Sequence, residues 1–252
     1  MEFGMTRFET GREWLDAPLQ DGISTPSATV ISGPGGAGKP LIALGVVTSW
    51  LQAGGSVIGA PLQFPDPDFL AHAAADLYDY DLRESGEYVH VRFDPDIDGV
   101  QHTGEKALRA NLVDPENWEQ TLDTAIESVG GGGPGILFFA TALNLPLLSP
   151  THADPLIETV GDVFDREVTS LVCVSTSMLA NRARAVGDLA DTLVTASVLE
   201  APKRLQFTVE RQDGEPVESN SVEAPFDPTL LESIQQRAER AKVVPTETIR
   251  NI

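Results

Sequence analysis

Residues 28–50 read ATVISGPGGAGKPLIALGVVTSW, and this stretch decides the fold. It begins with the apolar run Thr29, Val30 and Ile31, which predicts a buried β-strand. A glycine-rich segment follows, and after Lys39 apolar residues recur at helical spacing as far as about residue 51. The predicted order is therefore strand, glycine-rich loop, lysine and helix.

That order is the context in which a match to the Walker A motif has physical meaning. Glycines allow several backbone N–H groups to converge on one phosphate, and the helix N-terminus and the lysine add positive charge. The alternative is a loop that packs the fold and binds nothing. The residues expected to bind a nucleotide are Gly33, Pro34, Gly35, Gly36, Ala37, Gly38 and Lys39.

One position departs from the motif. The residue after the lysine should be Ser or Thr, because its hydroxyl binds the Mg²⁺ ion. Pro40 has no hydroxyl and no backbone N–H, although proline is tolerated in the first turn of a helix. We therefore expect at most weak binding of ATP or ADP, with little contribution from Mg²⁺.

The chain is strongly acidic, with 38 Asp and Glu against 17 Lys and Arg, and its net charge is −21. A dispersed acidic excess that prefers Arg to Lys is typical of proteins kept soluble in very high salt, so we expect a halophilic protein. The same charge repels a phosphate backbone, which argues against nucleic-acid binding. High salt would screen that repulsion and weaken the argument.

The 252 residues suffice for one large α/β domain with a sizeable core. No segment has the apolar length of a membrane helix, and the N-terminus lacks a signal-peptide pattern, so we expect a cytoplasmic protein. The single cysteine, Cys173, lies in an apolar run. It excludes a disulfide framework and predicts an inert buried thiol.

Apolar strands alternate with helical patterns for two thirds of the chain, and then strands follow strands. This order predicts an α/β fold with a mostly parallel central sheet between helices and antiparallel C-terminal strands. We expect one domain, with a lead-in at 1–27, a core at 28–226, and a C-terminal helix and tail at 227–252. The acidic segment 94–111 shows little periodicity and is expected to be a connection. Further strands are expected at 56–62, 88–93, 136–140, 171–175, 193–199 and 204–209, and helices at 68–82, 115–129, 155–168, 178–186 and 227–242.

Four fragments, in this order, resemble the RecA superfamily of P-loop ATPases, and within it the KaiC-like family. They read TGREWLDAPLQDGISTPSATVISGPGGAGK, LQAGGSVIGAPLQFP, DLRESGEYVHVRFDP and DLADTLVTASVLEAPKRLQFTVERQDGEP. The resemblance covers nearly the whole chain and implies a RecA-like fold.

The resemblance also implies catalytic positions, and this chain departs from them. Where the family has a catalytic Glu after its second strand, this chain has Gln63 and Phe64. The strand that should end in the Walker B Asp ends in Ala140. Of a Lys and an Arg that reach a neighbouring subunit's nucleotide, Val209 replaces the Lys and Arg211 keeps the Arg.

Other acids could in principle replace the missing ones. Asp66 and Asp68 follow the Glu position, but turn and cap roles are the stronger interpretation. Thr141 or Asp162 is a weaker candidate for the Walker B position. The four histidines show no metal-ligand spacing, so we expect no metal site and assign no catalytic residue.

Phosphoryl transfer depends mainly on positioning and on charge neutralisation by metal and cations. The favoured hypothesis is therefore a KaiC-like protein that does not hydrolyse ATP and acts as a regulatory or scaffold partner in signal transduction. It implies protein partners and either a homo- or a hetero-oligomer. The alternatives are a divergent active ATPase in signalling or recombination, and a DNA-associated RecA paralogue.

Overall fold

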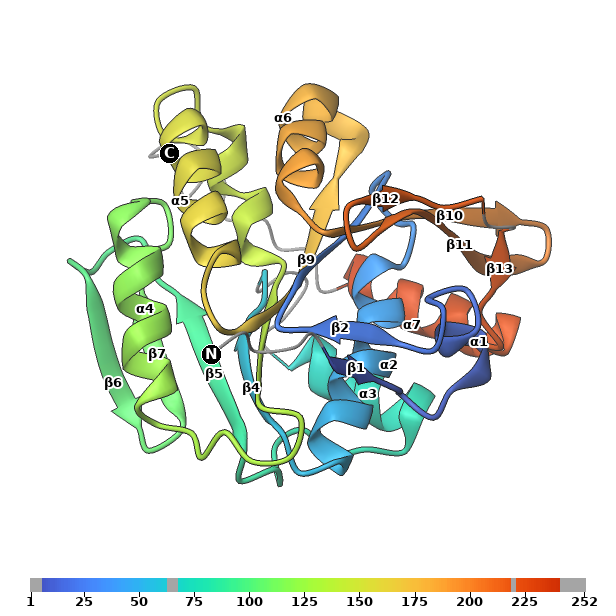
Figure 1. The fold of residues 1–252 in the computed structure, drawn as a ribbon, viewed down its shortest axis with the longest axis horizontal. Helices are drawn as coiled ribbons and strands as arrows, with labels where there is room; N and C mark the ends of the chain where they lie inside the picture. The colour runs from blue at the N-terminus through green and yellow to red at the C-terminus, as the bar shows by residue number, and fades with distance from the viewer. Residues whose placement is uncertain (1–5, 63–67, 219–220, 241–252) are drawn as a thin grey trace.

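A central β-sheet with helices on both faces organises the chain (Figure 1). The computed structural model describes residues 6–62, 68–218 and 221–240. The strands are β1 (Thr6–Phe8), β2 (Ile23–Thr25), β3 (Ala28–Gly33), β4 (Ser56–Ala60), β5 (Tyr88–Phe93), β6 (Val100–Gly104), β7 (Ala107–Ala110), β8 (Ile136–Ala140), β9 (Thr169–Ser175), β10 (Thr192–Glu200), β11 (Lys203–Gln212), β12 (Glu215–Pro216) and β13 (Val222–Glu223). The helices are α1 (Glu13–Asp16), α2 (Lys39–Gln52), α3 (Phe69–Tyr78), α4 (Glu116–Ile126), α5 (Ala153–Phe164), α6 (Thr176–Leu189) and α7 (Pro228–Arg240), with 3-10 turns η1 (Ala142–Asn144) and η2 (Pro146–Leu148).

The main sheet runs in the order β12-β11-β10-β3-β9-β8-β4-β5-β7-β6, and β13 pairs with β11. Every pairing from β10 across to β7 is parallel, whereas β11 pairs antiparallel with β10 and β6 with β7. The predicted parallel core with antiparallel C-terminal strands is therefore confirmed. β9 lies between the loop-bearing β3 and β8, so β8 is not a direct neighbour of β3.

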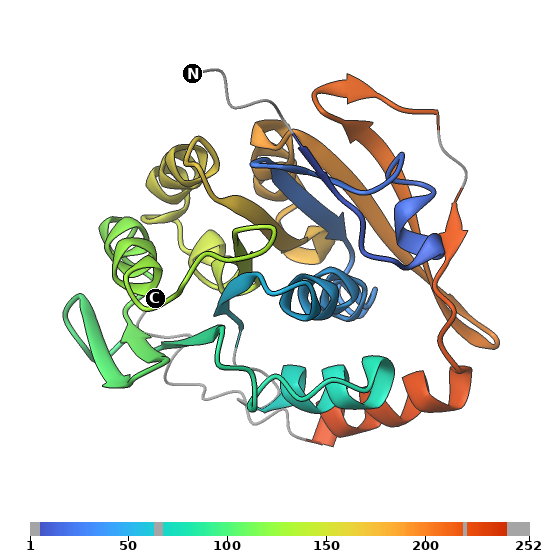
Figure 2. The same cartoon turned by 60° about the horizontal axis from the view of Figure 1, so that its bottom comes forward.

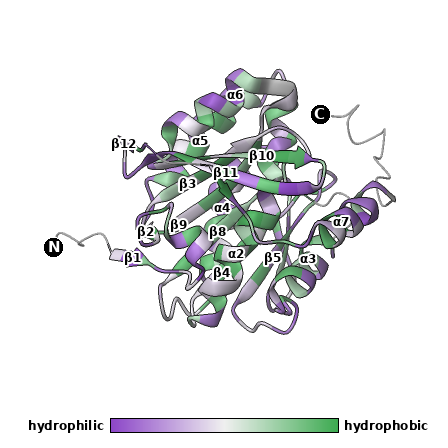
Figure 3. Cartoon of the chain, turned by 90° about the vertical axis from the view of Figure 1, so that its right-hand side faces the viewer, coloured by the Kyte–Doolittle hydropathy of each residue, from purple (hydrophilic) through white to green (hydrophobic). Residues whose placement is uncertain are grey.

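The two faces of the sheet carry separate hydrophobic cores. One core unites α1, α2, α3 and α7 against the sheet, and the other unites α4, α5 and α6. Helix α2 runs through the middle of its core and is buried all round, which explains its nearly continuous apolar sequence. Colouring by hydropathy shows green strands between helices whose outer faces are purple (Figure 3).

The segment 94–111, expected to be a connection, instead forms the hairpin of β6 and β7. β6 lies at the edge of the sheet and its residues are largely exposed, so nothing selects the alternating apolar pattern of a half-buried strand. The lead-in also contains structure that the sequence pattern did not predict, because β1 and β2 pair as a separate two-stranded sheet.

The lead-in is held to the end of β11 by specific polar contacts. Arg7 pairs with Asp213 at 2.5 Å, and the Ser24 hydroxyl donates to the same carboxylate at 2.6 Å. The Gln212 side-chain amide donates to the Leu19 carbonyl at 2.6 Å. At the other end of the chain, α7 lies beside α3 (Figure 2), where Arg237 pairs with Asp76.

Candidate functional site

The glycine-rich loop leaves the carboxyl end of β3 and turns directly into α2, as predicted. Gly38 is the N-cap of α2 and has a left-handed backbone, φ 66°, which favours glycine. At the start of the loop, a Cβ on Gly33 would collide with the Ala196 carbonyl oxygen of β10. The glycines therefore allow both the tight turn and the close approach of the neighbouring strand.

Lys39 folds back onto the loop that carries it. Its Nζ donates to the Gly33 carbonyl at 2.9 Å and to the Pro34 carbonyl at 2.7 Å, and only 6% of the residue is exposed. Burial lowers the pKa of this ammonium below its usual value. A phosphate in the loop would have to draw Lys39 away from these two carbonyl groups.

Two of the loop amides are also engaged within the chain. The Gly35 N–H donates to the Ser177 hydroxyl of α6 at 2.6 Å, and the Ala37 N–H donates to the Pro34 carbonyl at 3.3 Å. In the described part of the chain, the N–H groups of Gly36 and Gly38 have no such partner and face no internal competition for an anion. The sequence gave no sign of Ser177. It lies in the first turn of α6, which follows the carboxyl end of β9, and this end is next to the loop.

Pro40 occupies the first turn of α2, as expected of a residue without a backbone N–H. The Gly38 carbonyl accepts the next amides, from Leu41 at 2.9 Å and Ile42 at 3.1 Å. The helix therefore begins normally, and the place of a metal-binding hydroxyl is taken by a pyrrolidine ring.

The end of β8, where a Walker B acid would stand, is apolar, and hydrogen bonds tie the residues that follow it to the neighbouring strands. Ala140 is fully buried, and the Thr141 hydroxyl accepts the Leu62 N–H at 2.6 Å. Asn144 then ties this end to β9, because its amide donates to the carbonyls of Thr141 and Cys173 and its oxygen accepts the Ser175 N–H. Sequence analysis missed Asn144, whose one signal was an amide side chain in an otherwise apolar run.

Comparison with known proteins gives a match in structure alone. No protein-family model matches the chain, and no curated protein matches it in sequence. In the solved structures, 437 chains match its fold. Among them is the crystal structure of a KaiC-like protein from the hyperthermophilic archaeon Pyrococcus horikoshii OT3, with a TM-score of 0.67 over 89% of this chain and 96% of that one.

The fold is RecA-like. Sequence identity to the archaeal protein is 12%, so the similarity shows the fold alone. A fold shared by so many chains supports many functions, and the function of this chain depends on the residues in its site.

Arg211, for which the resemblance implies contact with a neighbouring subunit, makes hydrogen bonds within this chain. A β-bulge shifts the register, so that Val194 pairs with Val209 and the preceding Leu193 pairs with Arg211. Arg211 consequently leaves the face on which Val209 is buried. Its Nη2 donates to the carbonyls of Gly187 at 2.5 Å and Ala190 at 2.8 Å, at the end of α6.

The substitute acids lie away from the glycine-rich loop or outside the described residues. Gln63, Phe64 and Asp66 are outside the described ranges. Asp68 is the N-cap residue of α3 and borders a different cavity, next to β5. Asp162 lies near the C-terminal end of α5, which leads into the amino end of β9, whereas the loop follows the carboxyl end of the parallel neighbour β3.

No metal-binding group emerges from the described residues, since none of their His, Cys, Asp and Glu side chains gather in threes suitable for an ion. Burial raises the pKa of the Cys173 thiol to about 12, which agrees with the inert cysteine predicted. None of the described helices is long and apolar enough to cross a membrane.

Beside the loop lies a groove of about 270 Å³ between α2, β11 and α7. Its walls are mainly apolar, with Leu41, Leu205, Leu231 and Ile234 among them, and Lys203 stands at its border. The position of α7 therefore makes the C-terminal helix part of the surroundings of the loop.

Proposed function

We propose that this RecA-fold chain is a regulatory or scaffold protein that acts through protein contacts and does not hydrolyse ATP. ATP or ADP binds weakly at residues 33–39, nearly independently of Mg²⁺. The protein partner is contacted as part of a homo- or hetero-oligomer, and the chain works in the cytoplasm.

The observation that best supports the proposal is that Lys39 is buried and hydrogen-bonded to its own loop. In a working P-loop this ammonium neutralises the β- and γ-phosphates. Here it is bonded to two carbonyls of its own loop and desolvated, so phosphate binding must first break those bonds. Part of the binding energy is thereby lost, which supports weak affinity.

Two further positions support the proposal that Mg²⁺ contributes little and that ATP is not hydrolysed. Pro40 offers no ligand, and Ala140 is buried where a metal-holding carboxylate would be needed. Loss of one group that stabilises the transition state costs about 3 kcal/mol of barrier, and groups that act as a unit fail together. Turnover is then expected to fall to background.

Calorimetry with ATP and ADP, with and without Mg²⁺, tests nucleotide binding, and phosphate release in molar KCl tests turnover. Lys39→Ala should abolish the binding that exists. Lys106→Ala removes the same charge next to β7, five strands away from β3, where its ammonium is bonded to the Ser128 carbonyl, and should leave binding unchanged. An ordinary rate of hydrolysis that Lys39→Ala stops would refute the proposal.

The contact-based role needs its own measurement. The tagged chain, purified from its native cells in molar KCl, should bring down a protein at fixed stoichiometry. A salt-matched DNA-binding assay should be negative. Binding of DNA in that assay with no protein captured would favour the DNA-associated alternative instead.

A further inference from the structure

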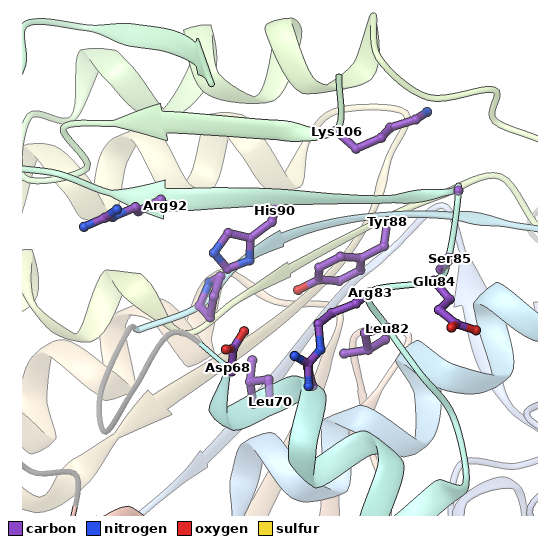
Figure 4. A pocket seen from close by; sticks show the side chains of 13 residues that line it. Asp68, Leu70, Leu82, Arg83, Glu84, Ser85, Tyr88, His90, Arg92 and Lys106 are labelled. Carbon is purple, nitrogen blue, oxygen red and sulfur yellow. The ribbon is translucent and has the colours of Figure 1, made fainter. Parts of the chain in front are cut away.

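A cavity of about 570 Å³ lies between β5 and the start of α3 (Figure 4). In the sheet order, β5 is four strands from the loop-bearing β3. With strands spaced about 4.8 Å apart, the separation is about 19 Å. The cavity also shares no lining residue with the groove beside the loop, so it is a separate place on the molecule.

One face of β5 supplies the polar side of this cavity. Tyr88, His90 and Arg92 occur at alternate positions and so point to the same side of the strand. The Tyr88 ring crosses the neighbouring strand β4 at Gly59, where a Cβ would collide with the Tyr88 hydroxyl. Gly59 therefore leaves the space in which this aromatic ring lies.

The rings of Tyr88 and His90 stand side by side, with centroids 6.5 Å apart and planes inclined by 37°. Both point from β5 toward α3 in the close view (Figure 4). Apolar groups of Pro61, Leu70 and Leu82 form the facing wall. A flat ring of a ligand would find aromatic surface on one side and aliphatic surface on the other.

Several polar groups around this space have no hydrogen bond inside the described part of the chain. The His90 imidazole and the Arg92 guanidinium make none there, and Arg83 has one loose contact with Asp81, at 3.9 Å. Burial lowers the pKa of His90, so the ring is neutral at pH 7 and offers one donor and one acceptor.

The charges also stand out against the rest of the chain, which carries a net charge of −21. Arg83, Arg92 and Lys106 border the cavity, against the acids Asp68 and Glu84. Lys106 is bonded to the Ser128 carbonyl and points away from the cavity (Figure 4). In the same view Arg92 lies beyond His90 and Arg83 lies below Tyr88, so a small anion would meet one of the two arginines and not both.

We propose that this cavity binds a small aromatic anion, in which a phosphate or carboxylate is attached to a flat ring. The ring lies against Tyr88 and His90, and the anion pairs with Arg92, which follows His90 on the same face of β5. Arginine forms two parallel hydrogen bonds to such groups, which gives geometry as well as charge.

The probe is phenyl phosphate, titrated by calorimetry in the lowest KCl concentration at which the chain remains folded by circular dichroism. Phenol and inorganic phosphate each lack one half of the recognised chemistry and should bind at least tenfold more weakly. Benzoate and adenosine monophosphate, compared in the same way, show which anion and which ring size are preferred.

Arg92→Gln and His90→Ala should each weaken phenyl phosphate binding at least fivefold. Arg184→Gln, which removes the same charge from an exposed position on α6, and Lys39→Ala in the glycine-rich loop should change it less than twofold. Arg92 is itself exposed, so its substitution leaves the core intact. Failure of every probe to saturate, equal binding of phosphate alone, or loss of binding in Lys39→Ala would each overturn the proposal.

Discussion

Proline after Lys39 is compatible with the helix but not with a metal ligand, and Ala140 is compatible with the core but not with a carboxylate. Each residue suits the place where it lies, which is why the local fold shows no strain at either position. The metal ligand and the carboxylate are absent from these two positions, while the geometry of strand, loop and helix is kept. Restoring the chemistry therefore means placing polar groups where this chain has none.

Pro40→Thr alone should recover no Mg²⁺ binding and no turnover, because a hydroxyl by itself cannot hold the ion. Combining it with Gln63→Glu and Ala140→Asp gives the best chance of Mg²⁺ binding and slow turnover. Because Ala140 is fully buried, the new carboxylate should destabilise the metal-free chain by about 2 kcal/mol or more. Urea unfolding with and without Mg²⁺ measures this, and unchanged stability of the metal-free variant would contradict the burial argument.

Among the elements, the end of α6 depends on Arg211, a residue for which the resemblance implied contact with a neighbouring subunit's nucleotide. Arg211→Ala should destabilise the chain by about 1–2 kcal/mol, because two carbonyls at the end of α6 lose their donor. Arg204→Gln on the same strand removes an exposed ion pair with Glu223 and should cost less than about 1 kcal/mol. Thermal unfolding measures both variants. If Arg211→Ala changed the oligomeric state and left stability unchanged, the result would favour contact of Arg211 with a neighbouring subunit instead.

The position of the glycine run that leads into β8 depends on the protonation state of Glu87. The Glu87 carboxylate accepts the Ser56 hydroxyl at 2.6 Å and the Gly130 N–H at 3.2 Å. These hydrogen bonds hold the pKa of Glu87 below its usual value near 4.5. The stabilisation is therefore complete above that value and is lost as the pH falls through the lower, folded-state pKa.

Glu87→Gln should accordingly lower the free energy of unfolding by about 1 kcal/mol at pH 7, since the site is partly exposed to solvent. The difference from the parent chain should shrink below pH 4.5. Urea unfolding from pH 7 to pH 3 gives the comparison, with Glu119→Gln on the surface of α4 as the control. A difference that stays constant across this range would show that the charge of Glu87 is irrelevant.

On the scale of the whole molecule, the acidic excess is mostly unpaired. Of 38 Asp and Glu, eight form ion pairs in the described residues, and these pairs are largely exposed. Like charges on a compact surface repel, and salt shortens the range of that repulsion to about 3 Å at 1 M. The melting temperature should therefore rise from dilute buffer to molar KCl.

Sucrose at matched osmolality provides the control, because it favours compact states without screening charge. A melting temperature that rises equally in sucrose, or does not rise in KCl, would remove the basis for a halophilic protein. The Arg7–Asp213 ion pair that ties the lead-in to the end of β11 should weaken in the same series, because salt screens attraction as well as repulsion.

The sequence by itself determined the strand, loop and helix of residues 28–50, the parallel core and the C-terminal antiparallel pair, because burial imposes a local period on each of these elements. It could not place the β6–β7 hairpin, whose exposed edge strand carries no such period. Only the tertiary structure showed the partners of Lys39 and the bulge that turns Arg211 toward α6. The direction and partners of a side chain depend on residues far away in the chain, and no local pattern records them.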